Sequence, residues 1–171
     1  MLIAVFLLAG PPAAAEEPAP CRASPTARAL DFWLGNWRVV GPDGQHYGDN
    51  RIEAALDGCA VLEHWTNAAG GQGISLFAYN GLADSWLQLW VTGDTARPGG
   101  YKEKRLIARG ADGSVRFQGV IEPGDGIRYL DRTTLTPLAD GRVRQVIERS
   151  MDGGQTWDVG FDAFYLPAGD P

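Results

Sequence analysis

Hydrophobic and polar residues alternate in short runs along most of the chain, and turns rich in glycine, aspartate and asparagine separate the runs. A period of two residues is typical of β-strands that bury one face. Runs of this kind predict ten strands, at residues 36–40, 48–56, 59–67, 73–80, 85–92, 102–109, 114–121, 126–137, 142–150 and 156–166. Between them we find no pattern with the period of a long helix.

The turns between these runs favour hairpins. Asp112-Gly113, Asp140-Gly141 and Asp152-Gly153 supply the positive φ angles that tight hairpins need, so consecutive strands are expected to be antiparallel neighbours. An open sheet of this length would expose two edges, which closure removes. The sequence therefore predicts an all-β protein with a single antiparallel up-and-down β-barrel of about ten strands. A two-sheet sandwich is the alternative.

The first part of the chain does not follow the strand pattern. An apolar run over residues 2–9, followed by Ala13-Ala14-Ala15, predicts a signal peptide over residues 1–15 and hence a secreted or periplasmic protein. Residues 16–30 are predicted as a flexible lead, with one short helical turn near its end, and residues 31–167 as the barrel domain.

Export makes the two cysteines interpretable. In an oxidising compartment an isolated pair tends to form a disulfide, so Cys21 and Cys59 are predicted to be bonded to each other. The chain has no Cys-x-x-Cys pattern and only two histidines, His46 and His64. We therefore expect neither a metal site nor a cofactor.

The charge balance is acidic. Twenty-one aspartate and glutamate residues oppose 15 lysines and arginines, which gives a net charge of -6. Such a chain lacks the positive field that recruits nucleic acid or anionic lipid. We expect no nucleic-acid partner and no membrane insertion after signal cleavage, and the sequence leaves the oligomeric state open.

A Gly-x-Trp motif at the first predicted strand carries a resemblance. Gly35-Asn36-Trp37 is similar to the start of the barrel in the lipocalin-like, or calycin, superfamily. Five segments together resemble a family of uncharacterised exported bacterial lipocalin-like proteins: residues 31–37, 58–65, 73–76, 86–91 and 150–157. The resemblance implies a barrel with a central cavity, in which Gly35 and Trp37 are structural and Trp37 plugs the floor.

Alternation then assigns residues to the lumen. Glu63 and Trp65 share one face of their strand, and Gln88 and Trp90 share one face of theirs. With Trp37 pointing inward, one consistent lumen contains the candidate ligand-binding residues Glu63, Trp65, Gln88, Trp90, Gln145 and Arg149. Aromatic walls with a few polar groups suit a small molecule. The alternative is that the tryptophans are ordinary core and Glu63 faces water.

Residues 150–157 fit the Ser-x-Asp-x-Gly-x-Thr-Trp pattern of an Asp-box turn. In such a turn the aspartate accepts backbone amides and the tryptophan packs beneath the hairpin. We therefore assign Asp152 and Trp157 a structural role.

Three functions fit these features. The leading hypothesis is an exported lipocalin-like protein that binds a small, partly apolar or amphipathic ligand in its lumen. The second is an enzyme of isomerase, dehydratase or decarboxylase type on the same barrel, with Glu63 as general acid or base and the only catalytic candidate. The third is an interaction module whose barrel is filled and whose outer surface binds a partner.

Overall fold

The computed structural model describes residues 20–124 and 126–169 of the chain, so the predicted signal peptide lies outside the described residues. Ten strands are present: β1 (Gly35–Val40), β2 (His46–Ala55), β3 (Ala60–Asn67), β4 (Gln72–Asn80), β5 (Ser85–Thr92), β6 (Tyr101–Arg109), β7 (Val115–Gly124), β8 (Ile127–Pro137), β9 (Val143–Ser150) and β10 (Asp158–Pro167). The helical elements are α1 (Pro20–Ala23), η1 (Asp31–Trp33) and η2 (Leu56–Gly58).

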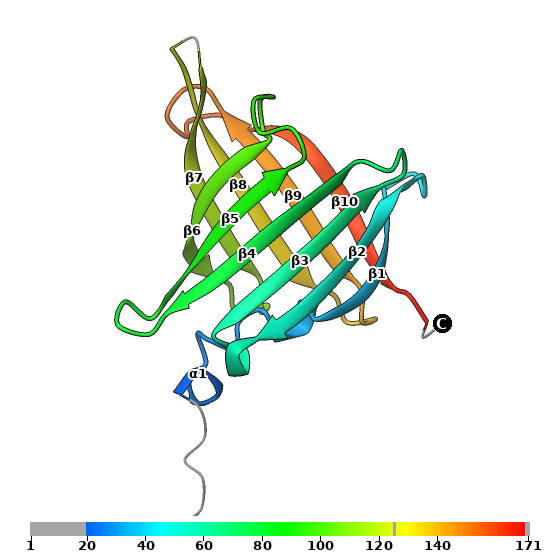
Figure 1. Ribbon diagram of the computed structural model, residues 1–171, viewed down its shortest axis with the longest axis vertical. Helices are drawn as coiled ribbons and strands as arrows, with labels where there is room; N and C mark the ends of the chain where they lie inside the picture. The colour runs from blue at the N-terminus through cyan, green and yellow to red at the C-terminus, as the bar shows by residue number, and fades with distance from the viewer. Residues whose placement is uncertain (1–19, 125, 170–171) are drawn as a thin grey trace, which may run out of the picture.

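The strands form one closed antiparallel barrel in up-and-down order (Figure 1). Each strand pairs with its neighbours in sequence, and β1 pairs with β10 from Trp37 opposite Pro167 to Val40 opposite Phe164. The predicted fold class is confirmed and the sandwich is excluded. The predicted bounds differ from the observed ones by up to three residues, most at β7, which continues to Gly124 because it stays paired with β8 up to Ile127.

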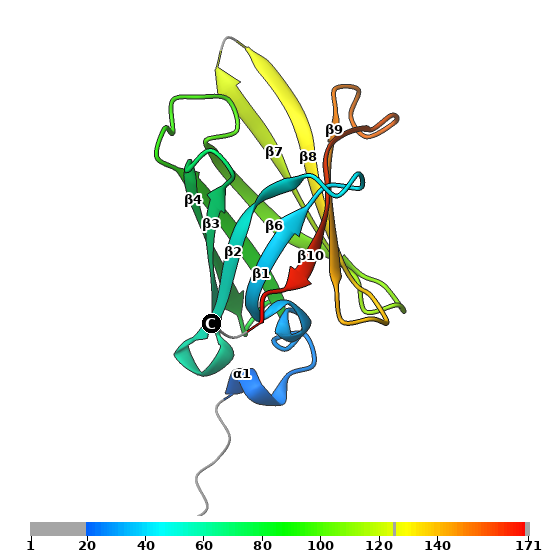
Figure 2. The same cartoon turned by 90° about the vertical axis from the view of Figure 1, so that its right-hand side faces the viewer.

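The segment before β1 covers one end of the barrel (Figure 2). Leu30 and Trp33 are fully buried there, and the indole N–H of Trp86 donates a hydrogen bond to the Thr26 carbonyl at 2.7 Å. The described part of the predicted lead, residues 20–30, thus packs against the barrel. Leu30 and Trp33, which follow the proline-rich stretch, are the apolar side chains buried beneath the barrel.

The apolar core fills the covered half of the barrel. Phe77 lies at its centre, with ring centroids 5.6 Å from Trp33 and 5.3 Å from Phe117 in edge-to-face arrangements. Trp37 is buried against Tyr165 and donates its indole N–H to the Trp33 carbonyl at 2.8 Å. The other end carries the long loop between β5 and β6.

A disulfide joins Cys21 to Cys59, with Cα atoms 5.2 Å apart, as predicted. It connects α1 to the chain just before β3 and so holds the covering segment against the barrel. Structural disulfides are typical of oxidising compartments. Among the described residues, no helix has the length and apolar character needed to cross a bilayer.

Removing the disulfide should destabilise the protein. The bond closes a loop with a sequence separation of 38, for which loop entropy gives about 4 kcal/mol. We expect the double variant Cys21→Ser, Cys59→Ser to lose roughly this free energy of unfolding, measured by urea denaturation, and wild-type protein under reducing conditions to match it. An unchanged denaturation midpoint in both samples would contradict the predicted contribution.

Candidate functional site

Above the apolar core the inward positions of the strands become polar. Along each strand, inward side chains alternate with outward ones. Alternation therefore places these polar side chains in the lumen despite their polarity. Nine polar or charged lumenal residues are buried: Asn50, Glu63, Ser75, Gln88, Lys102, Lys104, Asp131, Thr133 and Gln145. Their hydrogen bonds and ion pairs define two clusters, one around Glu63 and one around Asp131.

A cavity of about 260 Å³ lies against this polar layer, between it and the loop that joins β5 to β6. All six candidate ligand-binding residues line it: Glu63, Trp65, Gln88, Trp90, Gln145 and Arg149. Alternation along β3, β5 and β9 thus brings the six together in space. A larger groove of about 1000 Å³ crosses β6 and β7 outside the lumen, but Tyr101, Glu103 and Arg105 in its lining are exposed side chains, whereas the lumenal cavity has buried polar walls.

Glycines make room for the aromatic wall of the cavity. A side chain at Gly73 would collide with the ring of Trp90, because Gly73 lies on β4 beneath that ring. The Trp90 indole N–H donates to the Gly99 carbonyl at 3.2 Å, which ties the ring to the β5–β6 loop. Trp65 packs edge-to-face on Phe161 with centroids 6.5 Å apart. Both tryptophans are therefore held in place as walls of the cavity.

The first polar cluster surrounds Glu63. Asn50 donates to Oε1 at 2.8 Å, and the Ser75 hydroxyl donates to Oε2 at 2.5 Å. Gln88 in turn donates to the Ser75 oxygen at 3.2 Å. Burial raises the pKa of the Glu63 carboxyl, and the hydrogen bonds from Ser75 and Asn50 only partly offset this effect. Glu63 is thus a buried acid in the cavity wall whose proton is held more tightly than in water.

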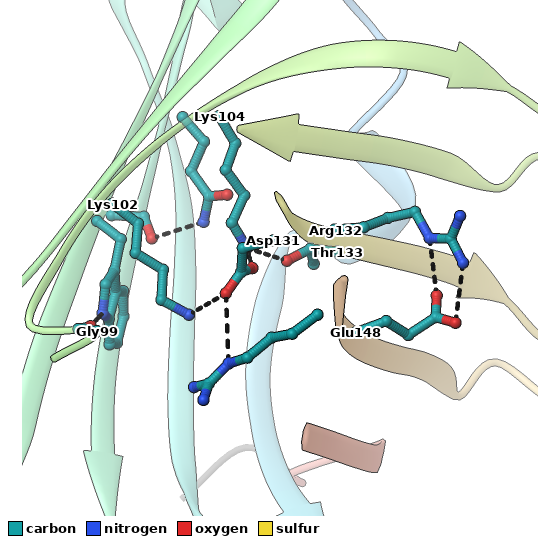
Figure 3. A network of polar contacts seen from close by, with 11 residues as sticks. Gly99, Lys102, Lys104, Asp131, Arg132, Thr133 and Glu148 are labelled. Atoms are coloured by element: carbon teal, nitrogen blue, oxygen red, sulfur yellow. Dashed lines mark hydrogen bonds and ion pairs between the residues drawn. The ribbon is translucent and has the colours of Figure 1, made fainter. Parts of the chain in front are cut away.

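The second cluster surrounds Asp131, which is fully buried (Figure 3). Lys102 Nζ lies 2.7 Å from Oδ2, Lys104 Nζ contacts Oδ1, and Arg149 Nε lies 3.9 Å from Oδ2. Lys104 also donates to the Thr133 hydroxyl at 2.5 Å. Burial acts to raise the pKa of Asp131, but the charges of Lys104 and Lys102 together hold it below the usual value.

The same cluster perturbs Lys104. Burial lowers the pKa of its ammonium group to about 8, although the attraction of Asp131 acts in the opposite direction. Tyr165 closes the polar layer towards the core: it donates to Gln145 Oε1 at 2.7 Å, and burial raises the pKa of its hydroxyl well above the ordinary value. Titratable groups therefore line the cavity on several sides.

Sequence reasoning missed the lysines and did not place Asp131 in the site. Lysine is seldom fully buried, so the sequence alone assigns Lys102 and Lys104 to the surface. One signal could have found them. In β6 the run Lys102-Glu103-Lys104-Arg105 is charged on both faces, and a strand of a closed barrel must turn one of its faces inward.

Asp152 and Trp157 form a turn outside the lumen. The Thr156 hydroxyl donates to Asp152 at 2.6 Å, and the backbone N–H groups of Gln155 and Thr156 donate to it at 2.9 Å each. The hydroxyl bond first, and the backbone bonds with it, lower the pKa of the Asp152 carboxyl. The guanidinium of Arg132 lies 3.7 Å from the Trp157 ring centroid and pairs with Glu148 through two bonds of 2.9 Å (Figure 3). These contacts brace the outer side of β8 and β9.

The histidines lie apart from the cavity lining. His46 is 3.4 Å from Asp49, and His64 is 3.5 Å from Glu53. Within residues 20–124 and 126–169, no three histidine, cysteine or acidic side chains are grouped as metal ligands.

Fold and site together define a closed ten-stranded β-barrel with a polar and aromatic lumenal cavity. No family model matches the chain, and no curated protein matches it significantly.

Stability should rise with pH above neutrality because of Lys104. The unfolded chain keeps the proton of this lysine up to about pH 10.4, whereas the folded protein releases it near pH 8. Between these values the unfolded state binds more protons, so the free energy of unfolding should increase by about 2 kcal/mol from about pH 8 to about pH 10.

Urea denaturation at a series of pH values measures this rise, and Lys104→Met is the matched variant, which should lack it. A free energy of unfolding that is flat or falls over this range in the wild type would contradict the prediction. So would an equal rise in the variant.

Proposed function

We propose that this protein is a lipocalin-like binding protein of a secreted or periplasmic setting, which holds a small, partly apolar molecule in its lumen. The observation that carries the proposal is the cavity of about 260 Å³. Part of its wall is formed by the aromatic side chains of Trp65, Trp90 and Phe161, and the rest includes polar side chains. Apolar area supplies affinity, and a few placed polar groups fix orientation. The disulfide supports the oxidising setting.

The cavity also favours this proposal over the interaction-module alternative, which requires a filled barrel. The lower half of the lumen is filled by the aromatic core, but the upper half is not. A volume of about 260 Å³ is just below the range of drug-sized sites, which begins at about 300 Å³. The proposed ligand is accordingly compact.

Binding can be tested with a neutral apolar probe, N-phenyl-1-naphthylamine, whose fluorescence increases in apolar surroundings. We expect saturable binding to the wild type and about tenfold weaker binding to Trp65→Ala, because the variant loses one aromatic wall. Trp157→Ala is the matched control, since this tryptophan lies outside the lumen against Arg132. Absence of saturable binding to the wild type, or equal losses in both variants, would count against the cavity as the binding site.

An enzyme on the same barrel is the second candidate. The observation that favours it is the raised pKa of Glu63 in the cavity wall, because a general acid works best when its pKa approaches the working pH. The carboxyl would exchange a proton with a bound substrate, and Ser75 and Asn50 would hold it in position.

Carbon-13 NMR of the glutamate carboxyls measures this directly. Glu63 should titrate above the ordinary value of about 4.3, and Glu63→Gln should remove that resonance. For any compound that the protein converts, Glu63→Gln should abolish turnover while binding is kept, and Glu148→Gln, on the outer side of β9, should leave turnover unchanged. Unchanged turnover in Glu63→Gln would refute the enzymatic role.

A further inference from the structure

The cluster around Asp131 contains more positive than negative charge. Lys102 and Arg149 approach the same carboxylate oxygen, Oδ2, and Lys104 contacts the other oxygen (Figure 3). The Lys102 and Lys104 side chains are only 10% and 3% exposed. A single carboxylate neutralises one of these three cations. The remaining positive charge is partly withdrawn from water, which is unfavourable unless another anion is present.

The rest of the cavity does not supply that anion. Arg97 adds a further cation to the lining, and Glu63 is the one acidic residue among the described residues that line the cavity. Glu63 is held by Asn50 and Ser75, so its oxygens are engaged with neutral donors. The positive cavity contrasts with the chain as a whole, whose net charge is -6. The cavity is thus a local region of positive charge in a chain whose overall charge is negative.

We propose that the ligand of this cavity is a compact organic anion whose acidic group binds between Lys102 and Arg149. This inference rests on the proposed function and specifies its ligand class. Among the described residues, Arg149 donates no hydrogen bond to another side chain, and its side chain is 51% exposed. It therefore stands at the mouth of the cavity, with its guanidinium carbon 5.5 Å from the Tyr129 ring centroid and its N–H groups left to bind a ligand. A guanidinium binds a carboxylate through two parallel hydrogen bonds, and the Lys102 ammonium adds a point charge.

A second contact lies deeper in the lumen. Gln88 is paired with Lys104 across β5 and β6, two positions below Lys102, which is a depth of about 7 Å. The Oε1 atom of Gln88 is buried and has no hydrogen-bond partner within the part of the chain that the structure describes, whereas its amide nitrogen donates to Ser75. A buried acceptor without a partner is unfavourable. A hydroxyl or N–H group on the ligand would satisfy it.

The aromatic walls span the distance between these two contacts. Trp90 is paired with Lys102 on β6, and Trp65 lies on β3, on the other side of β4 from Trp90 and beside Phe161. A flat apolar body can pack against these rings. The inferred ligand thus has an acidic group at one end, a hydrogen-bond donor at the other, and a planar body in between.

Isothermal titration calorimetry with three naphthalene probes tests this inference at neutral pH. 6-Hydroxy-2-naphthoate carries both groups, 2-naphthoate lacks the hydroxyl, and 2-naphthol lacks the carboxylate. We expect 6-hydroxy-2-naphthoate to bind at least about tenfold more tightly than 2-naphthol, since a charge-assisted bidentate pair is lost without the carboxylate. The affinity of 2-naphthoate should lie between the other two.

Substitutions test where the acidic group of the ligand binds. Arg149→Met should weaken binding of 6-hydroxy-2-naphthoate about tenfold and leave 2-naphthol unchanged. Lys102→Met should act in the same direction, with circular dichroism as the check of its fold. Arg144→Met is the matched control, because Arg144 carries the same charge on the outer face, where it pairs with Asp162 at 2.7 Å. It should leave both affinities unchanged.

The outcomes separate the two proposals. Equal binding of 2-naphthol and 6-hydroxy-2-naphthoate, or an equal effect of Arg149→Met on both probes, would overturn the anion inference and leave the lumenal binding function intact. A loss in Arg144→Met as large as that in Arg149→Met would also overturn it, since the effect would then follow the net charge. Failure of all three probes, together with N-phenyl-1-naphthylamine, to bind the wild type would overturn the proposed function itself.

Discussion

Pairing of β1 with β10 is the constraint on which the other features depend. It closes the sheet, so every second residue of every strand enters a single shared volume from which bulk water is largely excluded. A polar side chain on that face must then find its partner within the lumen. The covered half avoids the requirement because its side chains are apolar and pack around Phe77. The polar half meets most of it by hydrogen bonds and ion pairs, and Gln88 Oε1 is left without a partner among the described residues.

Asp131 has the same organising role for the polar half. Two lysines from β6 are buried there, and burial of ammonium groups is tolerated only with a charged partner. Neutralising Asp131 would leave Lys102 and Lys104 facing each other with the Thr133 hydroxyl as the remaining polar partner of Lys104. The aspartate therefore sets both the position of the lysines and the shape of the cavity beside them.

The sequence predicted the barrel well because hairpin turns and alternation are local properties, and in an up-and-down barrel local neighbours are also neighbours in space. Alternation likewise placed Glu63 and Trp90 on inward faces. It could not place Lys104 and Asp131 together, because their approach depends on the register between β6, β7 and β8, including a bulge in β6. The burial of Leu30 beneath the barrel also depends on long-range packing, which composition does not reveal.

Two carboxyl groups in one lumen have pKa values shifted in opposite directions, and this contrast bears on the charge of the cavity. Burial acts to raise the pKa of both groups. Glu63 accepts its hydrogen bonds from the neutral donors Ser75 and Asn50, and Lys104 acts on it only through its charge, so burial dominates and the Glu63 proton is retained more tightly. Asp131 contacts ammonium groups, so it stays ionised. Asp131 is the carboxylate that the cations contact, and Lys102, Lys104 and Arg149 outnumber it three to one. A compact anion at the mouth would bring the site closer to neutrality.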